Sequence, residues 1–94
     1  MALARVVTFE DVSGDRIAQL KRQIEEGERP EDLPATEIVI LHDAEGQAAL
    51  AILFFENEED YRRGDEIMNA MPADGTPGRR GSVTKYEVAV RRTA

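Results

Sequence analysis

The chain has 94 residues, of which 41% are hydrophobic and 33% charged, with a formal net charge of −7 and no cysteine. This length predicts one domain over residues 1–94, and the acidic balance argues against binding to nucleic acid or to an anionic membrane. No apolar run reaches the roughly 18 residues of a membrane span and no signal-peptide pattern opens the chain, so we expect a cytoplasmic protein.

The first third of the chain predicts a strand followed by a helix. Residues Ala4–Glu10 are rich in β-branched and aromatic side chains, which favour a strand. Ser13 is a suitable N-cap and Gly27 a suitable C′ residue for a helix between them. The apolar residues of that helix recur at helical spacing: Ile17, Leu20 and Ile24. Pro30 and Pro34 then indicate a loop.

The middle of the chain predicts a β-hairpin. Thr36–His42 and Ala48–Phe55 are two strand-like runs separated by a short turn. Gly46 lies in that turn, where we expect it to supply a positive φ.

A second helix is expected to begin after Asn57, which is a suitable N-cap. The next three residues are all acidic, as the positive end of a helix dipole favours: Glu58, Glu59 and Asp60. Gly64 lies among the apolar residues of one helical face and would allow close packing on the sheet. Those apolar residues are Tyr61, Met68 and Met71, and Pro72 ends the helix.

The last part of the chain predicts a loop and a fourth strand. Asp74 to Arg80 contains two glycines and two arginines but lacks phosphate-loop spacing, so we interpret it as a loop rather than an anion site. Val83 to Arg91 alternates in the manner of a strand. The complete order is β-α-β-β-α-β, which predicts a ferredoxin-like α+β fold with four antiparallel strands and both helices on one face.

The strand Ala48–Phe55 is apolar on both faces, although two helices can cover only one face of such a sheet. Burying roughly 400 Å² of apolar surface is worth about 10 kcal/mol before association costs, so an exposed second face is unfavourable. We expect a second copy of the chain to cover it, forming a homodimer in which Ala51, Leu53 and Phe55 lie at the interface. A loop from residues 27–35 and a different partner protein are the alternatives.

The run "LAILFFENEEDYRRGDEIMNAMP", residues 50–72, together with the strand order, resembles the dimeric α/β-barrel superfamily. That superfamily includes antibiotic-biosynthesis-monooxygenase-like and stress-responsive barrel-domain proteins. The resemblance implies a homodimer that closes a barrel, a small cavity between sheet and helices, and activities that include cofactor-independent oxygenation. The chain departs from the oxygenases in having no tryptophan, and its only histidine, His42, lies at a strand end rather than on the second helix. The resemblance therefore transfers no catalytic residue.

The residues that could carry chemistry are few. His42 is the one side chain of a type that commonly exchanges protons near neutral pH, and with Tyr61 it is a candidate catalytic residue. Asn69 is expected to be solvated, on the side of its helix away from Met68. No metal site and no cofactor are expected. The candidates for contact with a small hydrophobic ligand have apolar bodies: Phe54, Tyr61, Met68 and Tyr86.

Three functions fit this sequence. The first is a small monooxygenase-like enzyme that acts on a hydrophobic molecule without a cofactor. The second is a non-catalytic ligand-binding or regulatory module, and the third is a purely structural dimerisation unit. A fold alone does not choose among them.

Overall fold

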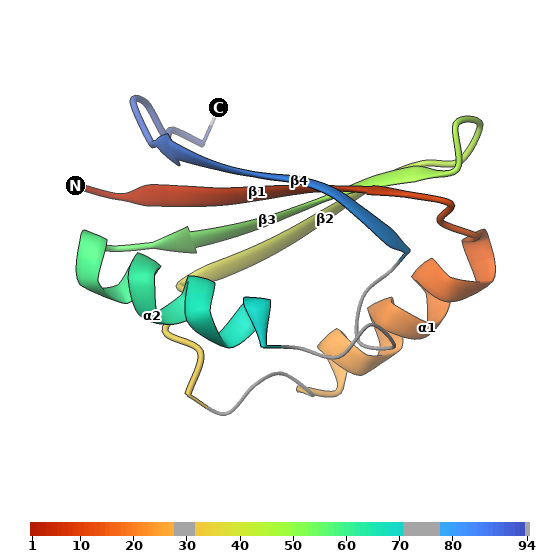
Figure 1. Cartoon of the computed structure of the whole chain (residues 1–94), viewed down its shortest axis with the longest axis horizontal. Helices are drawn as coiled ribbons and strands as arrows, with labels where there is room; N and C mark the ends of the chain where they lie inside the picture. Colours follow the sequence, from red (N-terminus) through yellow and green to blue (C-terminus); the bar gives the residue numbers. More distant parts are fainter. Residues whose placement is uncertain (28–31, 71–77, 94) are drawn as a thin grey trace.

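The computed structural model describes residues 1–27, 32–70 and 78–93. The elements follow the order β1 (Leu3–Glu10), α1 (Gly14–Glu25), β2 (Glu37–Asp43), β3 (Ala48–Phe55), α2 (Glu58–Asn69) and β4 (Arg79–Glu87). The strands form one antiparallel sheet in the order β2-β3-β1-β4. Both helices lie on the same side of it (Figure 1). The predicted ferredoxin-like α+β fold is therefore confirmed. None of the described helices is long and apolar enough to cross a membrane.

The helix boundaries follow from their caps. The Ser13 side chain accepts a hydrogen bond from the backbone N–H of Arg16, and the Asn57 side chain accepts one from the N–H of Asp60. Gly27 has a φ of 82° directly after the C-cap of α1, as its predicted role requires. The expectations for Pro30, Met71, Pro72 and residues 74–77 fall outside the described residues.

The β2–β3 turn differs from the prediction in one respect. The positive φ lies at Gln47, with a value of 51°, and not at Gly46. Gly46 instead approaches Asp43 closely: its N–H donates to Asp43 Oδ1 at 3.0 Å, and an added Cβ would lie 2.6 Å from Asp43 Oδ2. The glycine is suited to this turn by its small size rather than by its freedom of φ.

Strand β4 begins and ends earlier than predicted, covering Arg79–Glu87 instead of Val83–Arg91. Arg79 and Arg80, assigned above to a loop, pair with Glu10 and Phe9 of β1. The strand ends at Glu87, where its partner β1 begins at Leu3, and beyond that pair the N–H of Val88 still donates to the carbonyl of Ala2.

The two faces of the sheet carry alternate residues of each strand. On β3 the buried positions are Ala49, Ala51, Leu53 and Phe55, and the half-buried positions are Ala48, Leu50, Ile52 and Phe54. The buried set faces the helices. We call the other side the open face, and it carries Ala48, Leu50, Ile52 and Phe54 together with their neighbours on the other strands: Ala4, Val6, Thr8, Glu37, Val39, Leu41, Asp43, Thr84 and Tyr86.

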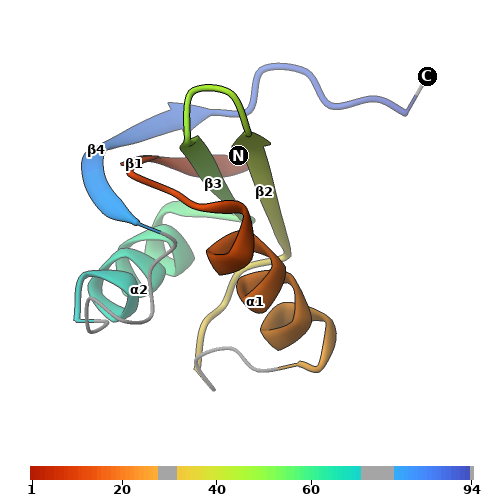
Figure 2. The same cartoon turned by 90° about the vertical axis from the view of Figure 1, so that its right-hand side faces the viewer.

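Figure 2 shows both helices beneath one face of the sheet, and the buried core residues lie on that side. One cluster lies beside α2 and contains Leu3, Leu33, Ala35, Leu53, Phe55 and Tyr61, and a second lies toward α1 and contains Val7, Phe9, Val12, Ala49 and Ala51. Gly64 lets α2 approach the sheet closely, as predicted, because a Cβ there would lie 2.3 Å from Phe55 Cε1.

This arrangement corrects the residues predicted for the dimer interface. Ala51, Leu53 and Phe55 are between 0% and 8% exposed in the single chain, because helices and the segment around Leu33 already cover them. Side chains buried in this way are not available to a partner. The apolar face without helices is the one that carries Leu50, Ile52 and Phe54.

Candidate functional site

An arginine interrupts the helix-facing row of β1. The row reads Leu3, Arg5, Val7 and Phe9, and Arg5 is only 2% exposed. A buried charge is costly unless it is paired and hydrogen-bonded. Arg5 is both: its Nε donates to Asp65 Oδ1 at 2.8 Å and its second terminal nitrogen donates to Asn69 Oδ1 at 3.1 Å.

Helix α2 supplies the partners of Arg5 from one stripe. Tyr61, Asp65 and Asn69 are spaced four residues apart, which places them one above another on the same side of the helix. The Asn69 amide also donates to Asp65 Oδ2 at 3.4 Å, which ties the two side chains together. Arg5 contacts this stripe from β1, so the stripe lies at the edge of α2 that borders both the sheet and the solvent.

Asn69 is thus an acceptor for two arginines. Arg80 of β4 donates to Asn69 Oδ1 at 3.0 Å, on the same oxygen that accepts from Arg5. Asn69 is exposed, as expected, but the expectation that it is only solvated is wrong, because it links β1, β4 and α2. We call Arg5, Asp65, Asn69 and Arg80 the arginine cluster.

Tyr61 lies beside the arginine cluster. Its ring is 7% exposed and packs edge-on against Phe55, with ring centroids 5.5 Å apart. The Lys85 ammonium lies 5.0 Å from the centre of the Tyr61 ring and also pairs with Glu58, 2.6 Å from Oε2. Burial, and next to it the negative charge of Asp65, raise the pKa of the Tyr61 hydroxyl above the ordinary value of 10.0, so the group is a hydrogen-bond donor at neutral pH.

His42 lies elsewhere. It pairs with Ala49 across the β2–β3 hairpin, so its side chain is on the helix-facing side at the hairpin end of the sheet, far along the strands from Arg5. Its Nε2 atom is buried and has no hydrogen-bond partner among the described residues. The structure therefore does not bring the two predicted catalytic candidates, His42 and Tyr61, into one site.

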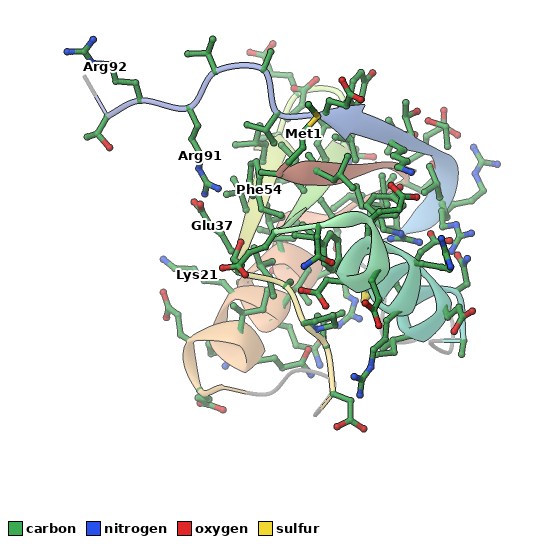
Figure 3. All side chains as sticks on the ribbon, turned by 90° about the vertical axis from the view of Figure 1, so that its left-hand side faces the viewer. Met1, Lys21, Glu37, Phe54, Arg91 and Arg92 are labelled. Atoms are coloured by element: carbon green, nitrogen blue, oxygen red, sulfur yellow. The ribbon has the colours of Figure 1, made fainter. Side chains whose placement is uncertain are left out.

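Of the other ligand-binding candidates, Met68 packs against the core cluster that contains Tyr61. Phe54 and Tyr86 lie on the open face, at positions paired to opposite sides of Ala4. The Arg91 guanidinium lies 4.3 Å from the centre of the Phe54 ring and also pairs with Glu37 of β2. Figure 3 shows Arg91 reaching from the C-terminal segment toward both residues, so this segment covers one end of the open face.

A shallow groove crosses the other end of the open face, with a volume of about 610 Å³. Three consecutive residues of each of three strands line it: Thr8, Phe9 and Glu10; Leu41, His42 and Asp43; Ala48, Ala49 and Leu50. Phe9, Ala49 and His42 are the middle residues of the three strand segments, and their side chains point toward the helices. Their backbone therefore forms the floor of the groove. The residues before and after them on each strand form its two walls. The groove is mostly apolar, with Glu10 and Asp43 on one wall.

Within residues 1–27, 32–70 and 78–93, no three histidine or acidic side chains gather in a way that could hold a metal ion. The arginine cluster and Tyr61 carry hydrogen-bond donors and positive charge on the helix-covered side of the sheet.

The sequence contained a signal for the arginine cluster, although no arginine was among the predicted site residues. Arg5 occupies a core-facing position of a strand that is otherwise apolar on that side. The interval of four between Tyr61, Asp65 and Asn69 defines a polar stripe next to the apolar stripe of Tyr61, Gly64 and Met68. A buried arginine opposite a carboxylate stripe predicts an ion pair between them.

Comparison with known proteins gives no match to a family model and no match to a curated protein sequence. Among solved structures, the chain is similar to a crystal structure described as a candidate antibiotic biosynthesis monooxygenase from Chloroflexus aurantiacus J-10-fl. The likeness covers 99% of this chain and 98% of that chain, with a TM-score of 0.63 and 15% sequence identity. The resemblance stated from the sequence is thereby confirmed at the level of the fold.

Proposed function

We propose that this protein is a homodimeric, monooxygenase-like enzyme that acts on a small hydrophobic molecule without a cofactor, with its site beside Tyr61 and the arginine cluster. The observation that carries this proposal is the buried Arg5, which brings Asp65 and Asn69 to the layer between sheet and α2. Such an ionic network costs desolvation energy that an apolar residue would not, so a functional role accounts for it well. The fold shared with a protein described as a monooxygenase supports the same class of reaction.

Cofactor-independent oxygenation needs a substrate that can itself reduce O2, and an activated methylene group next to a phenol fits. The methylene carbon is oxidised to a ketone, whose oxygen comes from O2, and both methylene hydrogens leave with the other oxygen atom as water. Atoms and electrons balance in this step. Tyr61 would donate a hydrogen bond to the substrate oxygen, since its raised pKa keeps the hydroxyl protonated. The positive charge of Arg5 would stabilise negative charge that develops on that oxygen.

The dimer is the second part of the proposal. The open face carries a contiguous apolar surface from Val39 and Leu41 through Leu50, Ile52 and Phe54 to Val6. Monomeric proteins rarely leave such a surface to water, and a second copy related by a two-fold axis offers it an identical apolar partner. Arg91 covers only the end at Phe54 and Glu37.

An oxygen-electrode assay tests the enzyme proposal. The purified protein is mixed with a panel of anthrones, which carry the activated methylene group, and O2 uptake is compared with the keto product formed. We expect one O2 per product and a rate at least tenfold lower for Tyr61→Phe, since this removes only the donor. Tyr86→Phe on the open face is the matched control and should retain the wild-type rate. An unchanged rate for Tyr61→Phe would show that the site is wrong.

The groove on the open face favours one alternative, a non-catalytic binding module. Its lining is largely apolar and its two carboxylates, Glu10 and Asp43, stand on one wall. If no substrate of the panel is consumed but a hydrophobic dye binds, and Leu50→Asp abolishes that binding while Tyr61→Phe does not, the groove is the functional site.

A further inference from the structure

We infer that Arg5 and Arg80 form a receptor for an oxyanion, and that the side-chain oxygen of Asn69 occupies the position of that oxyanion in the free protein. This inference names the substrate class of the site proposed above and takes its location from that proposal. The ligand it requires is a small molecule that carries an anionic oxygen, as a carboxylate or phosphate does.

The geometry places two cations on one neutral acceptor. Arg5 and Arg80 donate to Asn69 Oδ1 at 3.1 and 3.0 Å, from two neighbouring strands of the sheet. An amide oxygen carries only a partial negative charge, whereas hydrogen bonds from guanidinium to an ionised acceptor are shorter and roughly twice as strong. An oxyanion would therefore be a better partner for this pair than Asn69 is.

Among the described residues, the charges beside Asn69 leave a positive remainder of about half a unit charge. Arg5 and Arg80 contribute two positive charges, and Asp65 contributes one negative charge that is engaged by Arg5 Nε. Asn69 is the last residue of α2, and the helix end adds the equivalent of about half a negative charge. Lys85 and Glu58, on the far side of Tyr61, neutralise each other. A positive remainder in a chain of net charge −7 favours an anion at this point.

The site is rigid on one side and accessible on the other. Arg5 is almost completely buried and its Nε is fixed by Asp65, so the direction of its remaining N–H groups is preset. Asn69 and Arg80 are exposed, and Asp65 has 35% of its side chain exposed. Among the described residues, the Asn69 amide is the group that an anion would displace to contact both guanidinium groups.

The test is an NMR titration that follows the Arg5 Nε–H and the Asn69 side-chain amide. The probes are sodium benzoate, inorganic phosphate and, as a neutral analogue, benzyl alcohol. We expect benzoate or phosphate to shift both signals in a saturable way, and benzyl alcohol to leave them unchanged. Saturable binding of benzoate but not of phosphate would assign the site to organic carboxylates. Binding of phosphate but not of benzoate would assign it to inorganic oxyanions. Either result supports the receptor. Equal binding of benzyl alcohol, or no saturable shift with either anion, would overturn it.

Variants separate recognition from structural support. Arg80→Ala should weaken binding of the anion at least tenfold, whereas Arg79→Ala should not, because Arg79 is directed to Glu10 and Asp11. Asn69→Ala should strengthen binding several-fold, since it removes the internal competitor. Weaker binding by a folded Asn69→Ala variant, with an unchanged urea midpoint, would overturn the inference.

The oxygen-uptake assay keeps the two proposals distinguishable. Anion binding without oxygen uptake would refute the oxygenase and leave the receptor intact. Oxygen uptake without anion binding would refute the receptor alone.

Discussion

The two faces of the sheet differ in what covers them, although β3 supplies both with the same kinds of residue. Phe55 is 0% exposed beneath α2, whereas the adjacent Phe54 is half-buried on the open face under a single arginine. The helix-covered face also contains the one buried charge among the described residues, Arg5, while the open face is apolar along its centre. The comparison indicates that one face maintains the fold and holds the polar site, and that the other is suited to a partner.

The largest effect should come from removing the phenyl ring on the covered face. Phe55→Ala leaves a cavity between β3, Tyr61 and Gly64, and we expect it to lower the free energy of unfolding by about 3–5 kcal/mol. Phe54→Ala is the matched control and should lower it by less than half as much. Urea denaturation at two protein concentrations measures both and separates any contribution of association. Equal losses would contradict the assignment of the two faces.

The next largest loss of stability should come from breaking the buried ion pair between Arg5 and Asp65. The size of the loss should depend on which partner is removed. Asp65→Ala leaves the Arg5 guanidinium buried without its carboxylate and should cost about 3 kcal/mol of unfolding free energy. Arg5→Met replaces the cation by an apolar side chain and leaves Asp65 free to take up water, so it should cost clearly less. The same urea titration compares the two, and a larger loss for Arg5→Met would show that Arg5 acts mainly through packing.

A smaller effect is expected where α2 meets the covered face. Gly64→Ala places a methyl group against the Phe55 ring and should destabilise the protein by about 1–3 kcal/mol. Gly14→Ala, at the exposed start of α1, has no atom within 4 Å of the added Cβ and should be neutral or stabilising by about 0.5 kcal/mol. Thermal melting of both variants checks this difference, and a harmless Gly64→Ala would mean that α2 does not lie as close to the sheet as described.

The smallest effect is a pH dependence that arises from Tyr61 on the covered face. Its pKa is raised in the folded protein, so above pH 10 the unfolded chain releases the phenolic proton while the folded chain retains it. Stability should therefore fall as pH rises from 10 toward the raised pKa. Tyr61→Phe should make this fall shallower, and Tyr86→Phe on the open face serves as the control. Denaturant midpoints from pH 8 to 11 measure it, and a slope unaffected by Tyr61→Phe would contradict the raised pKa of Tyr61 in the folded protein.

The sequence was sufficient for the fold and for the presence of an uncovered apolar face, because both depend on periodicity and element order. It did not determine which alternate set of β3 residues faces the helices. Ala49, Ala51, Leu53 and Phe55 are as apolar as Ala48, Leu50, Ile52 and Phe54, so hydrophobicity alone does not distinguish them. Two contacts in the structure distinguish the sets. Leu53 pairs with Arg5 of β1, whose side chain reaches α2, and Phe55 packs closely against Gly64 of α2.

The candidate site was less predictable than the fold. The apolar body and polar end of Tyr61 make it a candidate from sequence, and it lies beside the arginine cluster. The position of Asn69 on its helix, away from Met68, predicts only a solvated side chain, because nothing local indicates its partners. Its partners Arg5 and Arg80 lie 64 and 11 residues away in the sequence, and only the three-dimensional structure brings them together.

The molar mass in solution tests the central contrast between the two faces most directly. If a second copy covers the open face, light scattering at micromolar concentration should give twice the chain mass of 10.5 kDa. Ile52→Asp, which places a charge at the centre of the open face, should return the mass to that of one chain while the fold persists. A wild-type protein that remains a single 10.5 kDa chain at micromolar concentration would contradict the account.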